Sequence, residues 1–257
     1  MQSLRDRLVF ITGASSGIGE ACAHAFAAQG ARILLAARRK DRLVALAKKL
    51  EVEHGVPCRA VTLDVRDQKK VAELIDKLPS EWSLIDVLVN NAGLSRGLVK
   101  LHEGSVPDWD EMIDTNIKGL LYMSRAVVPG MISRKRGDII NIGSIAGHEV
   151  YPNGAVYCAT KFAVRALTDG LRVDLLGSPL RVCSVDPGMV ETEFSLVRFR
   201  GDAARAAKVY EGLEPLTAED IADAVLYCAT RPAHVNVAEL LLLPTAQRSA
   251  TLAYRGK

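Results

Sequence analysis

Cysteine is scarce in this chain, and long apolar runs are missing. The five cysteines are an odd number, and no two of them form a CxxC pair. A disulfide framework and a cysteine-based zinc site are therefore disfavoured, and we expect a reducing compartment and no metal. Every apolar run falls short of the ~18 residues that a membrane-spanning helix requires. We expect no membrane partner.

Charge of one sign is also lacking. The net charge is only +3, and the 5% of aromatic residues do not interleave with the basic clusters as they would in a nucleic-acid platform. The first residues, MQSLRDRLVFITG, lack the regions of a signal peptide. No repeat or proline-rich linker divides the chain. We expect a cytoplasmic protein of one domain, residues 1–257, that does not bind nucleic acid.

Short apolar segments alternate with longer helical patterns along the chain. Hydrophobic residues make up 49% of it, and the predicted strands span residues 7–12, 31–37, 58–64, 85–91, 138–143, 180–186 and 239–243. Nearly continuous apolar strands are typical of a sheet that is covered on both faces. Between them, residues 39–55 place Leu43, Leu46, Ala47 and Leu50 on one helical face. The alternation predicts an α/β fold, a doubly wound parallel sheet of about seven strands with helices on both faces.

The segment TGASSGIG (12–19) joins the first predicted strand to the first helix. Gly13, Gly17 and Gly19 there would let a diphosphate approach backbone N–H groups at a helix N-terminus. A tight turn chosen for packing is the alternative, but the strand-to-helix position favours nucleotide binding. We expect cofactor contacts along the whole loop, from Gly13, Ser15, Ser16, Gly17, Ile18 and Gly19.

The second predicted strand is followed by two arginines. NAD-binding versions of this unit carry an acidic residue about 20 residues after the glycines, which binds the ribose 2′-OH. Arg38 lies 19 residues after Gly19, with Arg39 next to it, and neither position is acidic. A guanidinium suits a 2′-phosphate, so NADP is the predicted cofactor; a solvated basic helix start is the alternative.

Motifs spread over nearly the whole chain resemble the short-chain dehydrogenase/reductase family. They are TGASSGIG, LDV (63–65), NNAG (90–93), Asn116, Ser144, YCATK (157–161) and DPGMVET (186–192), in the family's order and usual spacing. Other segments, such as GLLYMSRAVVPGM and EFSLVRFRGD, are similar to the branch of NADP-dependent 3-hydroxy acid dehydrogenases, which includes serine and allo-threonine 3-dehydrogenases.

The resemblance implies a Rossmann-like fold, a homotetramer and a role for each matching position. Asn116, Ser144, Tyr157 and Lys161 match the catalytic tetrad, and Tyr157 and Lys161 also contact the cofactor. The adenosine side would be lined by Asp64, Val65, Asn90, Ala92 and Gly93, and the nicotinamide end by Pro187, Gly188, Val190 and Thr192.

The physical chemistry of Tyr157 and Lys161 agrees with those roles. Residues four apart share a helix face. Acid–base work at neutral pH would need the phenol pKa lowered by about 3 units, or ~4 kcal/mol, which a cation ~4 Å away supplies at an effective dielectric of about 20. An ordinary helix surface is the alternative for an isolated pair of this kind. His148 and Cys158 are interpreted as a surface residue and a packing residue.

The segment that follows Thr192 carries Arg198 and Arg200. If it is extended, residues two apart face the same side, and both arginines could hold a substrate carboxylate in the cleft with Ser144 and Tyr157. Solvated lid residues or subunit contacts are the alternative.

The predicted function is NADP-dependent hydride transfer between nicotinamide and a small 3-hydroxy acid or its carbonyl form. Two alternatives stay open. One is a reductase or dehydrogenase of a larger alcohol or carbonyl, such as a steroid, retinoid or acyl thioester. The other is a nucleotide-sensing protein without catalysis, since fold alone does not give function.

Overall fold

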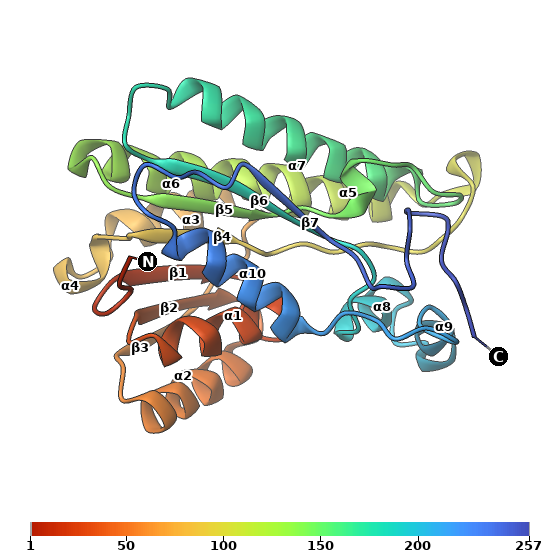
Figure 1. Cartoon of the computed structure of the whole chain (residues 1–257), viewed down its shortest axis with the longest axis horizontal. Helices are drawn as coiled ribbons and strands as arrows, with labels where there is room; N and C mark the ends of the chain where they lie inside the picture. The colour runs from red at the N-terminus through yellow and green to blue at the C-terminus, as the bar shows by residue number, and fades with distance from the viewer. Residues whose placement is uncertain (1, 257) are drawn as a thin grey trace.

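A computed structural model describes residues 2–256 and places seven parallel strands in one sheet, in the order β3-β2-β1-β4-β5-β6-β7 (Figure 1). The strands are β1 Leu8–Thr12, β2 Arg32–Ala37, β3 Cys58–Thr62, β4 Val87–Asn90, β5 Asp138–Ile142, β6 Arg181–Pro187 and β7 Glu239–Leu242. Every predicted strand overlaps an observed one, and the predicted α/β sheet is confirmed. The order changes direction between β1 and β4, which is where open sheets of this kind bind ligands.

Helices cover both faces of this sheet. The larger ones are α1 Gly17–Ala28, α2 Lys40–His54, α3 Gln68–Asp76, α5 Val106–Ile113, α6 Gly119–Arg134, α7 Ala155–Asp174 and α10 Ala218–Thr230. The short ones are α4 Ser80–Ser83, η1 Leu101–Glu103, η2 Asp114–Lys118, η3 Ile145–Gly147, α8 Glu193–Arg198 and α9 Ala203–Lys208. Figure 1 shows α1, α2 and α10 on one side of the sheet and α3, α6 and α7 on the other.

Side chains that alternate along each strand build the two cores. In β1, Val9 and Ile11 belong to the cluster on the α1–α10 face, while Leu8 and Phe10 belong to the cluster on the α6 face. All four are almost inaccessible to solvent. This explains why the strands read as continuous apolar runs. The predicted apolar face of α2 is also buried.

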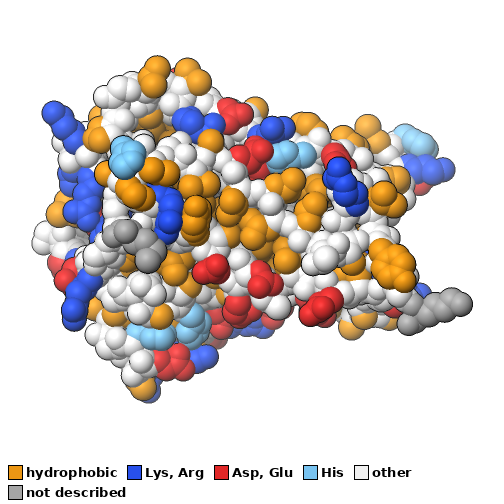
Figure 2. All heavy atoms as spheres, in the orientation of Figure 1, with side chains coloured by type: hydrophobic (Ala, Val, Ile, Leu, Met, Phe, Trp, Pro, Cys, Tyr) orange, Lys and Arg blue, Asp and Glu red, His pale blue; other side chains and the backbone are white. Residues whose placement is uncertain are grey.

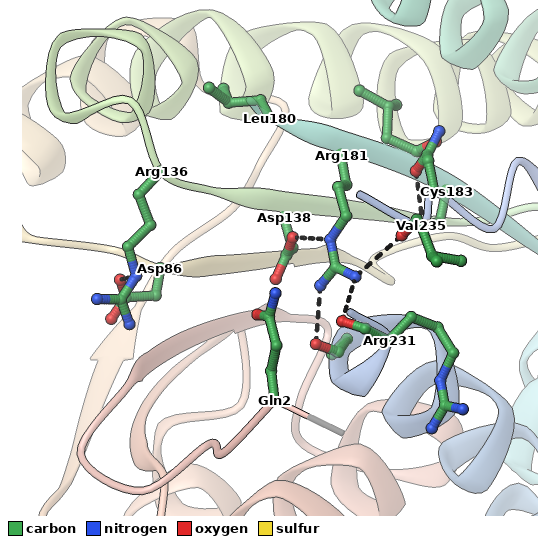
Figure 3. Close-up of polar contacts among 12 residues, drawn as sticks. Gln2, Asp86, Arg136, Asp138, Leu180, Arg181, Cys183, Arg231 and Val235 are labelled. Atoms are coloured by element: carbon green, nitrogen blue, oxygen red, sulfur yellow. Dashed lines mark hydrogen bonds and ion pairs between the residues drawn. The ribbon is translucent and has the colours of Figure 1, made fainter. Parts of the chain in front are cut away.

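A buried ion network closes the amino-terminal edge of the sheet. The Asp138 carboxylate pairs with Arg7 Nη2 at 2.9 Å and with Arg181 Nε at 2.6 Å. Figure 3 shows Arg181 reaching from Asp138 to the carbonyls of Arg231 and Val235. Losing one partner of such a buried pair typically costs ~3–5 kcal/mol. This network therefore holds β1, β5 and β6 together at the end of the sheet away from the glycine loop.

The surface carries charges of both signs. On the face shown in Figure 2, acidic and basic side chains are interspersed, and hydrophobic side chains gather across its middle. Among the helices of residues 2–256, none is both long and apolar enough to cross a membrane.

Candidate active site

A cavity of about 940 Å³ opens at the carboxyl-terminal ends of the strands. Its walls come from the loops after β1, β2, β4, β5 and β6, from α7 and from α8. Most residues predicted for the site line it: Gly13, Ser15, Ser16, Gly17, Ile18, Arg38, Arg39, Asp64, Val65, Ala92, Gly93, Ser144, Tyr157, Lys161, Pro187, Gly188, Val190, Thr192, Arg198 and Arg200. Gly19, Asn90 and Asn116 lie behind the wall. Motifs that are far apart in the sequence thus converge on one space.

The glycine loop has the backbone that the sequence predicts. Gly13 and Gly17 have φ of +65° and +56°, in the left-handed region that favours glycine. A Cβ on Gly19 would lie 2.5 Å from Asn91 Nδ2, so only glycine lets the start of α1 pack this closely. The N-terminus of α1 therefore faces the cavity, where its N–H groups and partial positive charge can hold an anion.

Arg39 lies directly over this loop. Its guanidinium donates to Ser15 Oγ at 3.0 Å and to Ser16 Oγ at 2.6 Å, and it pairs with Glu193 at 2.8 Å. Arg42 holds the same carboxylate at 2.8 Å. These two arginines lower the pKa of Glu193 to about 2. Arg42 and Glu193 were not predicted as site residues, because their contact joins α2 to α8 across 151 residues.

Arg38 and Asp64 lie on the neighbouring wall. Arg38 is half-exposed and approaches Glu111 at 3.8 Å. Asp64 binds Arg66 at 2.6 Å. Burial acts to raise the pKa of Asp64, but the hydrogen bonds and charge of Arg66 outweigh it and lower the pKa. The carboxylate is therefore ionised in the cavity.

Asn90 departs from its predicted place. Its Nδ2 donates to Asn141 Oδ1 at 2.9 Å inside the sheet, and the side chain does not reach the cavity. The next residue, Asn91, lines the cavity and donates from Nδ2 to the carbonyl of Thr12 at 2.9 Å. Successive side chains along a strand point to opposite faces, so Asn90 points into the interior while Asn91, one residue later, points into the cavity.

Lys161 and Tyr157 both extend from α7 into the deep part of the cavity. Lys161 Nζ donates to the carbonyl of Ile142 at 2.8 Å. Burial lowers the pKa of Lys161 to about 8, against the opposing charge of Asp186. The amine therefore loses its proton just above neutral pH.

The phenol itself differs from the expectation. Burial raises the pKa of Tyr157, and the nearby Arg198 and Ser144 oppose this only in part. Lys161 Nζ lies 6.0 Å from the centre of the Tyr157 ring. The predicted lowering of the phenol pKa is therefore not seen, because burial outweighs the opposing groups. The raised pKa favours the protonated phenol of Tyr157.

Asn116 belongs to η2, a π-helical turn between α5 and α6. Its side chain is fully engaged: Oδ1 accepts from Leu94 N at 2.9 Å, and Nδ2 donates to the carbonyl of Leu94 at 2.9 Å and to Thr160 Oγ1 at 3.0 Å. π-Helical turns are frequent at functional sites because they displace backbone groups from the regular ladder. Asn116 thereby fixes the loop after β4 against α7.

Ser144 and Thr192 each begin a short helix at the cavity wall. Ser144 caps η3, accepting from Ala146 N at 3.1 Å, and Thr192 caps α8, accepting from Phe194 N at 3.2 Å. Gln247, which was not predicted from the sequence, accepts from Met189 N at 2.9 Å and also lines the cavity.

Arg198 is buried beside Tyr157. Its guanidinium lies 5.3 Å from the Tyr157 ring centre and 5.1 Å from that of Phe194, and Nη2 donates to Tyr151 Oη at 3.0 Å. Only 9% of the residue is exposed, and Nε is buried without a hydrogen-bond partner. Within residues 2–256, no carboxylate forms an ion pair with Arg198. The site thus holds an uncompensated cation.

Two expectations about this region are wrong. The segment with Arg198 is not extended: Thr192 caps it, and it forms helix α8, so the two-residue alternation of a strand does not apply to Arg198 and Arg200. Arg200, with φ of 53°, is largely exposed and pairs with Asp108. His148 is not a surface residue either, because it is mostly buried and contacts Asp186 at 2.9 Å.

A family model described as short chain dehydrogenase matches residues 7–201. The chain therefore belongs to the short-chain dehydrogenase family, which confirms the predicted family and makes it an oxidoreductase by class.

Its similarity to particular members is also high. The NADP-dependent 3-hydroxy acid dehydrogenase YdfG of Salmonella typhi is 49% identical over 246 residues, 95% of this chain and 98% of that protein. Sulfoacetaldehyde reductase 2 of Chromohalobacter salexigens is 46% identical over 241 residues, 93% of this chain and 95% of that protein. The closed form of serine dehydrogenase complexed with NADP+ superimposes with a TM-score of 0.90 and 46% identity, covering 97% of this chain and 100% of that one.

Proposed function

We propose that this protein is an NADP-linked oxidoreductase that interconverts small 3-hydroxy acids and their carbonyl forms. The observation that carries the proposal is the buried, uncompensated guanidinium of Arg198 beside the Tyr157 phenol. An anionic group on the substrate would be held next to the proton donor, which sets the hydroxyl at a fixed place. Relatives named for a 3-hydroxy acid, for serine and for sulfoacetaldehyde support a small substrate of this kind.

The residues of the cavity suit NADP. The glycine loop and the N-terminus of α1 would hold the diphosphate. A Cβ at Gly13 would lie 2.9 Å from Ala92 Cα, so glycine is needed for the loop to keep its place against the segment after β4. Arg39, with Ser15 and Ser16, would hold the 2′-phosphate through charge-assisted hydrogen bonds. Thr192 and the Pro187–Gly188 turn would hold the nicotinamide end. When bound, the nicotinamide supplies or accepts the hydride.

The tetrad would move the proton. In carbonyl reduction, Tyr157 donates its phenolic proton to the substrate oxygen, and its buried, protonated state suits it to this role. Ser144 Oγ donates a hydrogen bond to the same oxygen, where negative charge develops. Lys161, as an ammonium, stabilises the phenolate that remains. By family resemblance, Lys161 also binds the ribose, and Asn116 positions a water in the relay to solvent.

Arg198 would orient the substrate. A guanidinium binds a carboxylate or a sulfonate through two N–H groups, and Nε is the donor that lacks a partner here. Tyr151 Oη accepts from Nη2, which holds the guanidinium in place beside the phenol of Tyr157. A large neutral substrate such as a steroid would leave this buried cation unpaired, which disfavours that alternative.

Substitution of Arg198 tests the proposal. Arg198→Ala should reduce kcat/KM for a small 3-hydroxy acid about 10- to 150-fold, because a charged hydrogen bond contributes ~1.5–3 kcal/mol. An uncharged alcohol of similar size should lose little. Arg200→Ala is the matched control, since that arginine pairs with Asp108, and it should retain most activity. Equal losses on charged and uncharged substrates would contradict an anion-holding role.

We also propose that residues 1–257 act as one domain, that the protein is cytoplasmic, and that it forms a homotetramer. Exposed apolar side chains on two helices and an edge strand support the assembly: Phe162 and Val173 on α7, Leu121 on α6 and Leu241 on β7.

A further inference from the structure

Polar side chains from α7, β6, β7 and the turn η3 contact one another in a row that none of the roles above uses. His148 Nε2 is 2.9 Å from Asp186 Oδ2, and His148 Nδ1 is 3.9 Å from Glu239 Oε1. The other oxygen of Glu239 accepts from Arg165 Nε at 2.9 Å. Asp186 Oδ1 also accepts from Ser184 Oγ at 2.5 Å. We call Arg165, Glu239, His148 and Asp186 the Asp186 chain.

Each part of the Asp186 chain adjoins a residue of the site. His148 follows Ser144 through the single turn of η3. Arg165 lies one helical turn after Lys161 on α7. Asp186 directly precedes Pro187 in β6. The Asp186 chain therefore links three segments of the active-site wall, which are η3, α7 and β6.

Gly143 shows how closely the carboxylate approaches. A Cβ at this position would lie 1.8 Å from Asp186 Oδ1, so the absence of a side chain makes the space that the carboxylate fills. Gly143 lies between Ile142, whose carbonyl accepts from Lys161 Nζ, and Ser144. The carboxylate thus sits against the backbone segment that holds both catalytic side chains.

The charge on Asp186 acts on Lys161. Within residues 2–256, Lys161 forms no ion pair within 4.0 Å, and the charge of Asp186 favours its ammonium form. Burial raises the pKa of Asp186, and the hydrogen bonds from Ser184 and His148 oppose that rise. Whether Asp186 carries its charge therefore depends on these two partners.

We propose that His148 is a positioning residue for Lys161: its hydrogen bond keeps the Asp186 carboxylate ionised and in place, so that the ammonium of Lys161 persists at the pH of catalysis. The charged groups that face His148 are Asp186 from β6 and Glu239 from β7, and Arg165 from α7 neutralises Glu239. Arg165 occupies Oε2 of Glu239, and Oε1 of the same carboxylate faces His148. The role in turnover rests on the proposed function.

The pH profile of carbonyl reduction tests the inference. Losing the His148 hydrogen bond lets Asp186 take up a proton, so Lys161 should lose its own proton at lower pH. In His148→Ala, the alkaline limb of kcat should move down by about 0.5–1 pH unit. His148→Gln keeps an N–H donor without a ring and should restore the limb. His102→Ala, at an exposed histidine, is the matched control and should leave the limb unchanged.

A second variant and a second readout separate the possible failures. Asp186→Asn keeps the shape of the side chain and removes its charge, so it should move the limb in the same direction as His148→Ala. The titration of Lys161 can also be followed without turnover, from the pH dependence of its modification by an amine reagent, quantified by peptide mass spectrometry. A protein that reduces no 3-oxo acid would contradict the proposed function alone. An unshifted Lys161 titration in His148→Ala or Asp186→Asn would overturn the role of His148, whatever the activity.

Discussion

Lys161 is subject to two opposing influences at one amine. Burial disfavours its charge, while the Ile142 carbonyl and the more distant Asp186 carboxylate favour it. The resulting pKa of about 8 means that the ammonium is present at neutral pH and is lost soon above it. In the proposed mechanism, the cation that would stabilise the Tyr157 phenolate is thus available only over a limited range of pH.

The pH dependence of reduction follows from this. Because the charged form of Lys161 is needed, kcat for carbonyl reduction should fall as pH rises through about 8. Lys161→Arg retains its charge at any accessible pH, so whatever activity remains should not show this fall. Initial rates of NADPH consumption from pH about 6 to about 10 would show both effects. A wild-type profile that stays flat over this range would contradict the assignment.

Single residues also show which parts of the site could be predicted from the sequence and which could not. Tyr157, Lys161 and Ser144 could be predicted because short motifs carry them. The role of His148 could not, because its partner Asp186 lies 38 residues away and only the fold brings them together. Arg198 lines the cavity, but its segment is a helix and not the extended stretch that was predicted, and Thr192 followed by EFSLVR was the capping signal that could have shown this.

At the level of elements, the strands were the easiest to predict, and the contacts of α8 the hardest. Strands buried on both faces are continuous runs of apolar residues in the sequence, as LVFIT of β1 is. The contacts of α8 are polar and long-range: Glu193 at its start is held by Arg39 and Arg42 from the β2–α2 region. No local sequence pattern indicates such a contact, because Glu193 and the two arginines, each taken alone, are typical of solvent-exposed charged residues.

We expect the β2–α2 turn to determine the preference for NADP+ over NAD+. Arg39→Asp removes the cation over Ser15 and Ser16 and places a carboxylate beside Glu193, so NADP+ should bind about 10- to 150-fold more weakly while NAD+ loses little. Titration of the protein's fluorescence with each cofactor measures this. Arg42→Ala, which loses only the contact with Glu193, is the control and should change the ratio much less. Equal dissociation constants for NADP+ and NAD+ in the unmodified protein would refute the assignment of Arg39.

The molecule as a whole uses the two edges of its sheet differently. The amino-terminal edge carries the buried Arg7–Asp138–Arg181 network, which serves stability, and the carboxyl-terminal edge opens into the cavity. The outer surfaces of the helices that cover the sheet carry exposed apolar side chains, including Phe162 and Val173 on α7. Closed symmetric assemblies commonly cover such surfaces.

Light scattering at micromolar concentration tests the assembly. We expect a particle of about four times the 27.8 kDa of the chain. Phe162→Glu places a charge on the exposed face of α7 and should reduce the particle size, whereas Val52→Glu, at an exposed position of α2, should not. Particles of the mass of one chain in the unmodified protein would rule out the tetramer.

The central claim is that Tyr157 transfers the proton in NADP-linked oxidoreduction of small 3-hydroxy acids. The most direct measurement is the rate of NADPH formation with a panel of small 3-hydroxy acids, for the unmodified protein and for Tyr157→Phe, together with the NADP+ dissociation constant of each. We predict turnover by the unmodified protein and a loss of ~10²–10⁴ in kcat for Tyr157→Phe, with NADP+ binding nearly unchanged. Near-normal turnover in Tyr157→Phe, or no oxidation of any 3-hydroxy acid by the unmodified protein, would contradict the claim.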